Sequence, residues 1–220
     1  MTDPTLGPLV AALDEANPDI RYHALIGLKM IHGDVRPAVL PVSLQLKDKS
    51  EKSDLIFMAS VAALTHFGPQ SAPAVPALIA AYQEKRLSPH GLGRVLQAIG
   101  PAAEDAAPVF LDVLRQPENR GDFDFAALTI LRIAPKRTDE AVTILSNHLV
   151  DPKIRPYALH ALEVDIVNRL LALNHHGHEV RTSPMSPESR KKVEAALPTM
   201  EAGHAQIVRR VLALTAREAK

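Results

Sequence analysis

Three histidines within four residues, His175, His176 and His178, form the densest group of metal-binding side chains in this chain of 220 residues. Imidazole nitrogens bind Zn²⁺, Ni²⁺ and Cu²⁺, so the segment is a candidate transition-metal site. No nearby acid makes a convincing further ligand. His148 and His160 lie on expected helices and would contribute only if the segment folded back. We therefore expect no metal and no cofactor, and the alternative of metal capture by this segment stays open.

The sequence contains no other group of residues arranged for catalysis. It has no cysteine, which excludes disulfides, thiolate zinc sites and cysteine nucleophiles. It also lacks a glycine-rich phosphate loop, a nucleophile elbow and a pair of carboxylates at a catalytic spacing. The stretch Gly91-Leu92-Gly93 is too short for a nucleotide fingerprint, and in a helix it permits close packing. We expect a protein that is not an enzyme.

The charge balance argues against several classes of partner. Lysine plus arginine equals aspartate plus glutamate at 25 each, so the formal net charge is zero. Proteins that bind duplex DNA usually carry a basic excess, and the local basic groups at residues 190–192 and 209–210 are interpreted as solvated helix faces. No signal peptide is visible, and no run of about 18 uncharged apolar residues could span a membrane. We expect a cytoplasmic monomer with a protein partner, and neither nucleic-acid nor membrane binding.

Proline and glycine recur along the chain at intervals that indicate a repeat. The prolines are separated by 33, 35 and 32 residues, and each opens a short apolar run, at Pro8, Pro41, Pro76 and Pro108. Gly68-Pro69 and Gly100-Pro101 are typical helix ends, because glycine accepts a positive φ and proline cannot continue the helix. A period of this length without strand signals predicts stacked helix pairs.

Five helix pairs follow from this period. They are expected at residues 6–14 with 19–31, 37–47 with 54–67, 73–83 with 89–99, 106–115 with 123–133, and 139–149 with a helix that begins at 152 or 153. Residues 166–173 extend that last helix, residues 174–187 form the histidine-rich loop, and helices at 188–197 and 204–216 close the stack. The expected domains are therefore a repeat array at 1–165 and a divergent capping region at 166–220 within one continuous solenoid.

Two segments carry a recognisable signature. Residues 17–28 (NPDIRYHALIGL) and 151–162 (DPKIRPYALHAL) resemble the second helix of a HEAT-like repeat of the phycobilisome-lyase type, with the pattern Asp-x-x-Val-Arg-x-x-Ala-x-x-Ala-Leu. The resemblance implies an all-α, right-handed α-solenoid of about five HEAT-like helix pairs plus a divergent C-terminal pair. It also implies that Arg21 and Arg155 are structural, bridging adjacent turns. The middle pairs depart from the pattern, and Phe57 stands where Arg21 would.

The same resemblance sets the range of functions. Such repeats form interaction scaffolds, assist chromophore attachment, hydroxylate with iron, remove alkylated DNA bases, or are appended to larger bacterial enzymes such as sulfatase-like hydrolases. An iron enzyme of this kind would need several His-Glu dipeptides, and the chain has only His178-Glu179. A base-removing enzyme would need a basic groove with stacking aromatics, and the chain has no tryptophan, three tyrosines and five phenylalanines.

We predict a non-catalytic protein-protein interaction scaffold that binds its partner through the concave face of the solenoid. If Ile20, Ile56 and Ile154 point into the stack, residues two, three and six positions later face outward. Aromatic residues, methionine and arginine are enriched in interface cores. The candidate partner-binding residues are Tyr22, His23, Met58, His90, Arg94, Phe125, Tyr157 and His160.

Other interpretations remain open. Several of these side chains could simply pack between neighbouring second helices. The chain could be an accessory array fused to or docked on a larger enzyme, a sulfatase-like hydrolase or a chromophore lyase. A metal-dependent or DNA-repair enzyme is the remote alternative.

Overall fold

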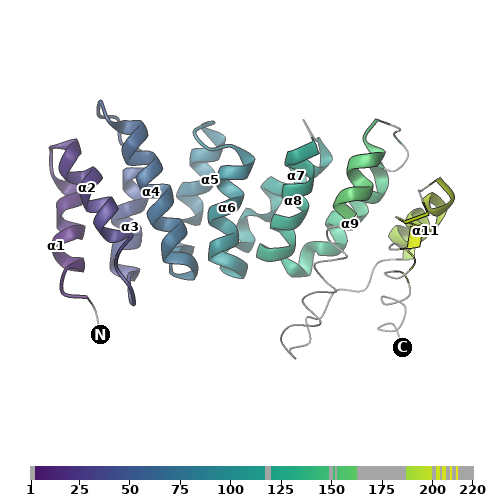
Figure 1. Cartoon of the computed structure of the whole chain (residues 1–220), viewed down its shortest axis with the longest axis horizontal. Helices are drawn as coiled ribbons and strands as arrows, with labels where there is room; N and C mark the ends of the chain where they lie inside the picture. Colours follow the sequence, from purple (N-terminus) through teal and green to yellow (C-terminus); the bar gives the residue numbers. More distant parts are fainter. Residues whose placement is uncertain are drawn as a thin grey trace. The chain divides into compact units, whose positions relative to one another are not determined.

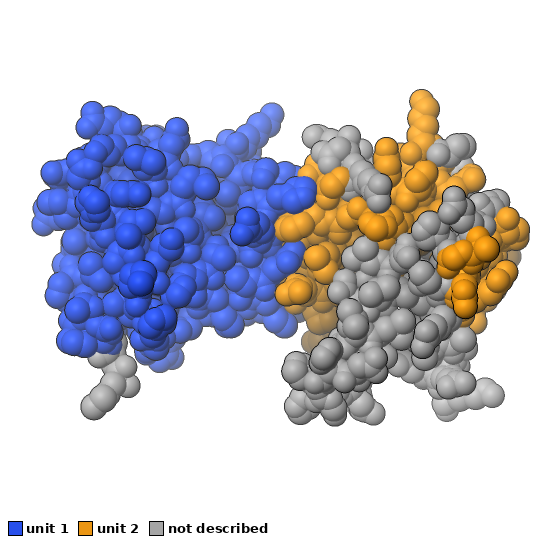
Figure 2. All heavy atoms as spheres, in the orientation of Figure 1, with its two compact units in different colours: residues 1–106 blue, residues 107–220 orange. Residues whose placement is uncertain are grey.

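A computed structural model describes residues 3–116, 120–148, 151, 153–162 and 187–199, and beyond these only residues 202, 203, 205, 206, 209 and 212. Every regular element of this described part is helical (Figure 1), which confirms the all-α class. The chain forms two compact units, Met1–Ala106 and Ala107–Lys220, which are coloured separately in Figure 2. The boundary expected at 165 falls outside the described residues.

Unit 1 is built from three helix pairs in two layers. The first helices of the pairs, α1, α3 and α5, pack side by side, and so do the second helices, α2, α4 and α6 (Figure 1). All six were expected from the period. Their bounds are α1 Leu6–Ala11, α2 Pro18–Leu28, α3 Arg36–Gln45, α4 Ser53–Phe67, α5 Val75–Gln83 and α6 Pro89–Ile99, with 3₁₀ helices η1 Ala12–Asp14, η2 Gly68–Ala74 and η3 Gly100–Ala106.

Glycine and short polar side chains set the ends of the second helices. Gly68 and Gly100 end α4 and α6 with φ of 57° and 77° and strongly negative ψ, a backbone conformation that is nearly restricted to glycine. At the opposite ends, the Asn17 side chain accepts a 2.9 Å hydrogen bond from Asp19 N, and Ser88 Oγ accepts one from Gly91 N at 3.1 Å. These contacts satisfy backbone donors that a helix start leaves open.

The prolines mark where α-helix replaces 3₁₀ helix. Pro76 and Pro108 lie in the first turns of α5 and α7, directly after η2 and η3, and both helices begin within two residues of the starts expected at 73 and 106. A proline costs little there, because the N–H it lacks has no helical acceptor. Pro41 differs, since it lies inside α3 and deprives the carbonyl of Pro37 of its usual donor.

The core of unit 1 lies between its two layers. Leucine, alanine and valine are its commonest residues, and the largest side chains with almost no exposed surface are Leu13, Leu25, Leu28, Ile56, Leu64, Leu78, Leu92, Leu96 and Ile99. Burial of each such side chain stabilises the fold by about 1.5–3 kcal/mol before chain entropy is counted. Each helix pair therefore depends on its neighbours for part of its core.

Unit 2 contains α7 (Ala107–Arg115), α8 (Arg120–Ile133), η4 (Pro135–Arg137), α9 (Thr138–Asn147), helical residues 155–162, α11 (Pro187–Ala196) and η6 (Leu197–Thr199). Helix α7 packs on α8 and α9, and α11 packs on α9. His148 Nε2 lies 2.8 Å from Leu114 O, which joins the end of α9 to α7. The helix extension expected at 166–173 and the expected histidine-rich loop, with His175, His176 and His178, lie outside the described residues, as does most of the last expected helix.

Candidate functional site

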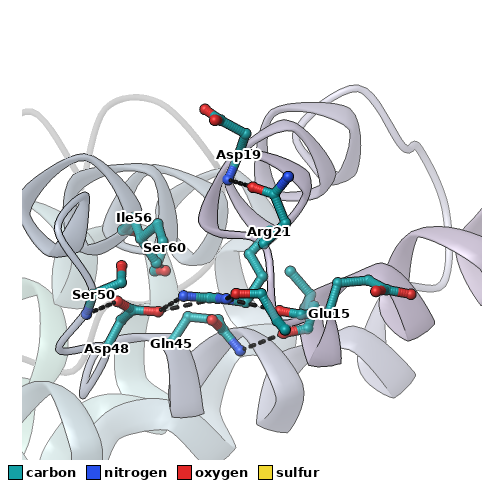
Figure 3. Close-up of polar contacts among 11 residues, drawn as sticks. Glu15, Asp19, Arg21, Gln45, Asp48, Ser50, Ile56 and Ser60 are labelled. Atoms are coloured by element: carbon teal, nitrogen blue, oxygen red, sulfur yellow. Dashed lines mark hydrogen bonds and ion pairs between the residues drawn. The ribbon is translucent and has the colours of Figure 1, made fainter.

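Arg21 lies at the centre of a polar network between the first two helix pairs (Figure 3). Its Nη1 donates to Glu15 O at 2.7 Å and to Ala16 O at 2.8 Å, in the turn before α2. Its Nε and Nη2 donate to Asp48 Oδ2 at 3.1 and 2.6 Å, in the turn after α3. Only 11% of the Arg21 side chain and 7% of the Asp48 side chain are exposed. We call this arrangement the Arg21 bridge, and it agrees with the structural role that the sequence implied for Arg21.

The carboxylate of Asp48 is held in its charged form. Burial raises its pKa, but hydrogen bonds from Ser50 and Arg21 more than offset this, so the pKa lies below its ordinary value. Ser50 N donates to Asp48 Oδ1 at 2.7 Å. A carboxylate with a lowered pKa, already paired with a guanidinium, is a poor general base. The Arg21 bridge is therefore suited to structure and not to proton transfer.

The next turn is held by a different arginine. Phe57 occupies the position on α4 that Arg21 occupies on α2, and its side chain is buried. The Arg86 guanidinium lies 4.1 Å from the centroid of the Phe57 ring and donates to Leu46 O. Arg86 comes from the turn between α5 and α6, so the third pair supplies the cation that the second pair lacks. We call this contact the Arg86 bridge.

A charged pocket of about 640 Å³ lies beside these two bridges. Its lining contains as many cationic as acidic side chains and no histidine, aromatic or thiol. The lining residues are Lys47, Asp48, Lys49, Ser53, Asp54, Glu84 and Arg86.

The predicted partner-binding residues of unit 1 lie on the outer side of the second helices. Met58 on α4 is 62% exposed, and His90 and Arg94 on α6 are also exposed. Tyr22 on α2 is half-buried and occupies the position equivalent to Met58 and His90. Among the described residues, no acidic side chain pairs with Arg94.

The expectations for His23 and Ile20 have different outcomes. His23 is exposed, as expected for an outward position, although the equivalent residue of α4, Ala59, is buried. Ile20 was expected to point into the stack and this is wrong, because it is 42% exposed while its counterpart Ile56 is fully buried. The physical reason is that α2 packs on α4 on one side and, among the described elements, has no second helix on the other.

Three further apolar residues of the second helices are exposed, Ile26 on α2, Met30 just after it and Leu55 on α4. Ile26 lies six positions after Ile20, where an outward side chain was expected, whereas Met30 and Leu55 were missed from the sequence. Ile26 and Met30 follow Tyr22 at helical intervals of four, and Leu55 precedes Met58 by three, so they continue the same rows. We call this surface the second-helix face, made of Tyr22, Ile26, Met30, Leu55, Met58, His90 and Arg94.

The opposite layer of unit 1 also exposes apolar residues. Leu40 and Leu44 lie four residues apart on α3 and are 59% and 66% exposed. The neighbouring helices α1 and α5 carry no charged residue. We call this surface the first-helix face, and it was not predicted because outward positions were sought on the second helices only.

In unit 2 the predicted residues are less exposed. Phe125 on α8, together with Tyr157 and His160 on the helix at 155–162, is half-buried. His160 Nε2 lies 3.6 Å from Asp124 Oδ2. Arg155 is also half-buried, and its backbone N–H donates to Asp151 O at 2.8 Å.

In the part of the chain that the structure describes, no three histidine, aspartate or glutamate side chains gather as a metal site. The described helices include none that is both long and apolar enough to cross a lipid bilayer.

Comparisons with known proteins give little further information. No protein-family model matches the chain, and no curated protein is similar to it. A crystal structure of an engineered protein from the Northeast Structural Genomics Consortium aligns with a TM-score of 0.48 and 16% identity, over 98% of this chain and 98% of that one.

Proposed function

We propose that this chain is a non-catalytic protein-interaction scaffold whose second-helix face binds a partner. The observation that supports this is the row of exposed apolar side chains on two neighbouring helices, Ile26, Leu55 and Met58, in the same layer as the exposed guanidinium of Arg94. Burial of such residues away from water is favourable. Methionine, aromatic and arginine side chains are also those enriched at the centres of interfaces.

The arrangement in pairs is part of the proposal. Two layers of helices in unit 1, with a repeated glycine end and a bridge at each of two successive turns, support a right-handed solenoid of HEAT-like pairs. In such a solenoid the second helices line the concave surface. The partner would then bind by shape and burial, with no covalent chemistry.

The experiment that tests the proposal compares two apolar surfaces of unit 1. Peptides are selected against the full chain from a random 16-residue display library, and their affinities are then measured for the wild type, Met58→Asp and Leu40→Asp. We expect Met58→Asp to weaken binding at least about tenfold, the effect of a central interface residue. Leu40→Asp, the matched control on the first-helix face, should change affinity less than twofold.

If Leu40→Asp weakened peptide binding and Met58→Asp did not, the second-helix face would be rejected as the binding surface. Circular dichroism and thermal unfolding of both variants identify any loss of fold, which neither should show because both side chains are exposed.

The second candidate is an accessory array docked on a larger enzyme, and the first-helix face favours it. Exposed Leu40 and Leu44 could hold the chain against a catalytic domain while the second-helix face remains open. Under that function, Leu40→Asp would release the chain from its enzyme and leave peptide binding at Met58 intact.

A further inference from the structure

We propose that His32 and His66 together bind one divalent transition-metal ion. His32 lies in the loop after α2, and His66 lies in the last turn of α4. Both side chains are exposed, and their ring centroids lie 5.8 Å apart with an interplanar angle of 56°. This pair belongs neither to the second-helix face nor to the histidine segment at 175–178.

The spacing of the two rings suits a shared ion. With metal–nitrogen bonds of about 2.1 Å, the centroids of two imidazoles on one tetrahedral ion lie about 5 Å apart, and a wider angle at the metal brings them to about 6 Å. The 5.8 Å separation of His32 and His66 falls within this interval. The distance between the rings is therefore that of two imidazoles on one ion, each with one nitrogen directed at it.

The backbone that carries the two histidines is fixed by a side chain from η2. Gln70 Nε2 donates to Gly33 O at 2.8 Å, and Gln70 Oε1 accepts from Val35 N at 2.9 Å. These bonds tie the loop beside His32 to the segment that follows His66. The two backbone segments are thus held together before an ion arrives, which lowers the entropy cost of binding.

The helix dipole of α4 also favours a cation, because His66 lies at the C-terminal end of this helix, where the dipole is negative. Two cationic side chains are close to His32 in sequence, Lys29 and Arg36. Arg36 is paired with Asp34 at 2.7 Å, which offsets its charge. Imidazole ligands favour Cu²⁺, Ni²⁺ and Zn²⁺ over Mg²⁺ and Ca²⁺, so the ion that the two histidines bind is one of the first three.

Two protein ligands leave coordination positions for water or for a group from another molecule. No third histidine or acid among the described residues joins the pair. The ion would connect the loop after α2 with the end of α4, and so link the first helix pair to the second. Metal binding should therefore stabilise unit 1 against unfolding.

The test uses the full chain, purified without an affinity tag, with zinc chloride as the probe. A background variant H175A/H176A/H178A removes competition from the histidine segment. On this background the thermal midpoint should rise by roughly 3–6 °C when free zinc is ten times the dissociation constant. Substitution His32→Ala or His66→Ala should weaken zinc binding at least about tenfold, since even outer-shell partners of metal ligands carry 10–100-fold in affinity.

His23→Ala is the matched control, because it removes another exposed histidine from the same region and should leave the affinity unchanged. His32→Asn and His66→Asn repeat the test with polar side chains if an alanine variant unfolds. Zinc affinity within twofold of the background in either variant at position 32 or 66 would overturn the shared site. Loss of all zinc binding in the background variant would overturn it too.

Discussion

The turns of the first and second helix pairs meet the same requirement with different side chains. In both, backbone carbonyls at a helix reversal need a donor from outside the helix. The Arg21 bridge supplies it from α2 together with an ion pair to Asp48, whereas the Arg86 bridge supplies it from the next pair, over the ring of Phe57. One motif residue can therefore disappear from a repeat if a neighbouring repeat replaces its contacts.

The two bridges should differ in how much each contributes to stability. The Arg21 bridge has two nearly buried charges with four hydrogen bonds between 2.6 and 3.1 Å. The Arg86 bridge combines one backbone hydrogen bond with a cation–π contact. Loss of one partner from a buried ion pair is much more costly than loss of a half-exposed contact.

The largest effect is expected for Arg21→Ala. This change leaves the Asp48 carboxylate without its guanidinium and two turn carbonyls without a donor, so we expect a loss of about 4 kcal/mol in the free energy of unfolding. Urea denaturation followed by circular dichroism measures it. Arg36→Ala, which breaks an exposed ion pair with Asp34, is the control and should have no measurable effect. Equal stability of both variants would contradict a structural role for the Arg21 bridge.

Phe57→Ala tests the apolar half of the second bridge. Phe57 is 3% exposed, so its truncation creates a cavity and should lower the free energy of unfolding by about 3 kcal/mol. The same denaturation experiment measures it. Phe57→Leu, which keeps most of the volume, should lose less than half as much. If the leucine variant were as unstable as the alanine variant, contact with Arg86 rather than packing would dominate.

Arg86→Ala should cost about 1–2 kcal/mol, the sum of one backbone hydrogen bond and a partly buried cation–π contact. Arg86→Lys keeps the charge but loses the planar stacking, and should recover less than half of this. A loss as large as that of Arg21→Ala would show that the two bridges contribute equally, which would contradict the expected difference between them.

Low pH should also weaken the Arg21 bridge. Of the four losses of stability predicted here, this one should be the smallest. Because the folded pKa of Asp48 is lowered, its contribution is fully present above the ordinary value of 3.8 and is lost as pH falls through the folded pKa. The stability difference between the wild type and Asp48→Asn should therefore shrink between pH 5 and pH 2.5. Asp3 and Asp34 titrate alike in both proteins and cancel. A constant difference over this interval would mean that the pKa of Asp48 is the same in the folded and unfolded states, and would contradict a bridge that stabilises its charged form.

Local signals in the sequence were enough to predict much of unit 1. The ends of α4 and α6 follow from Gly68 and Gly100, whose positive φ only glycine adopts readily. The role of Arg21 followed from its place in a recognisable segment.

Contacts between repeats were not predictable in the same way. No periodic signal in the sequence connects Arg86 with Phe57. Phe57 stands where the motif has an arginine, and Arg86, which replaces the contacts of that arginine, lies outside the motif. The exposure of Ile20 depends on which helix packs beside α2. The exposure of Leu40 and Leu44 depends on what covers the outer side of the first layer. These are properties of packing and not of any single segment.

The candidate site could be predicted only in part. Met58 and Arg94 are exposed as expected, whereas Phe125 and Tyr157 are half-buried in unit 2. Regular helical spacing identifies a side of a helix, but not how much of that side a neighbouring helix covers.

Amide hydrogen exchange of the full chain, with and without a selected peptide, tests the proposed binding surface most directly. We predict slower exchange in α2, α4 and α6 on peptide binding, and unchanged exchange in α1, α3 and α5. Protection confined to α3 and its neighbours in the first layer would contradict the proposal and assign binding to the first-helix face.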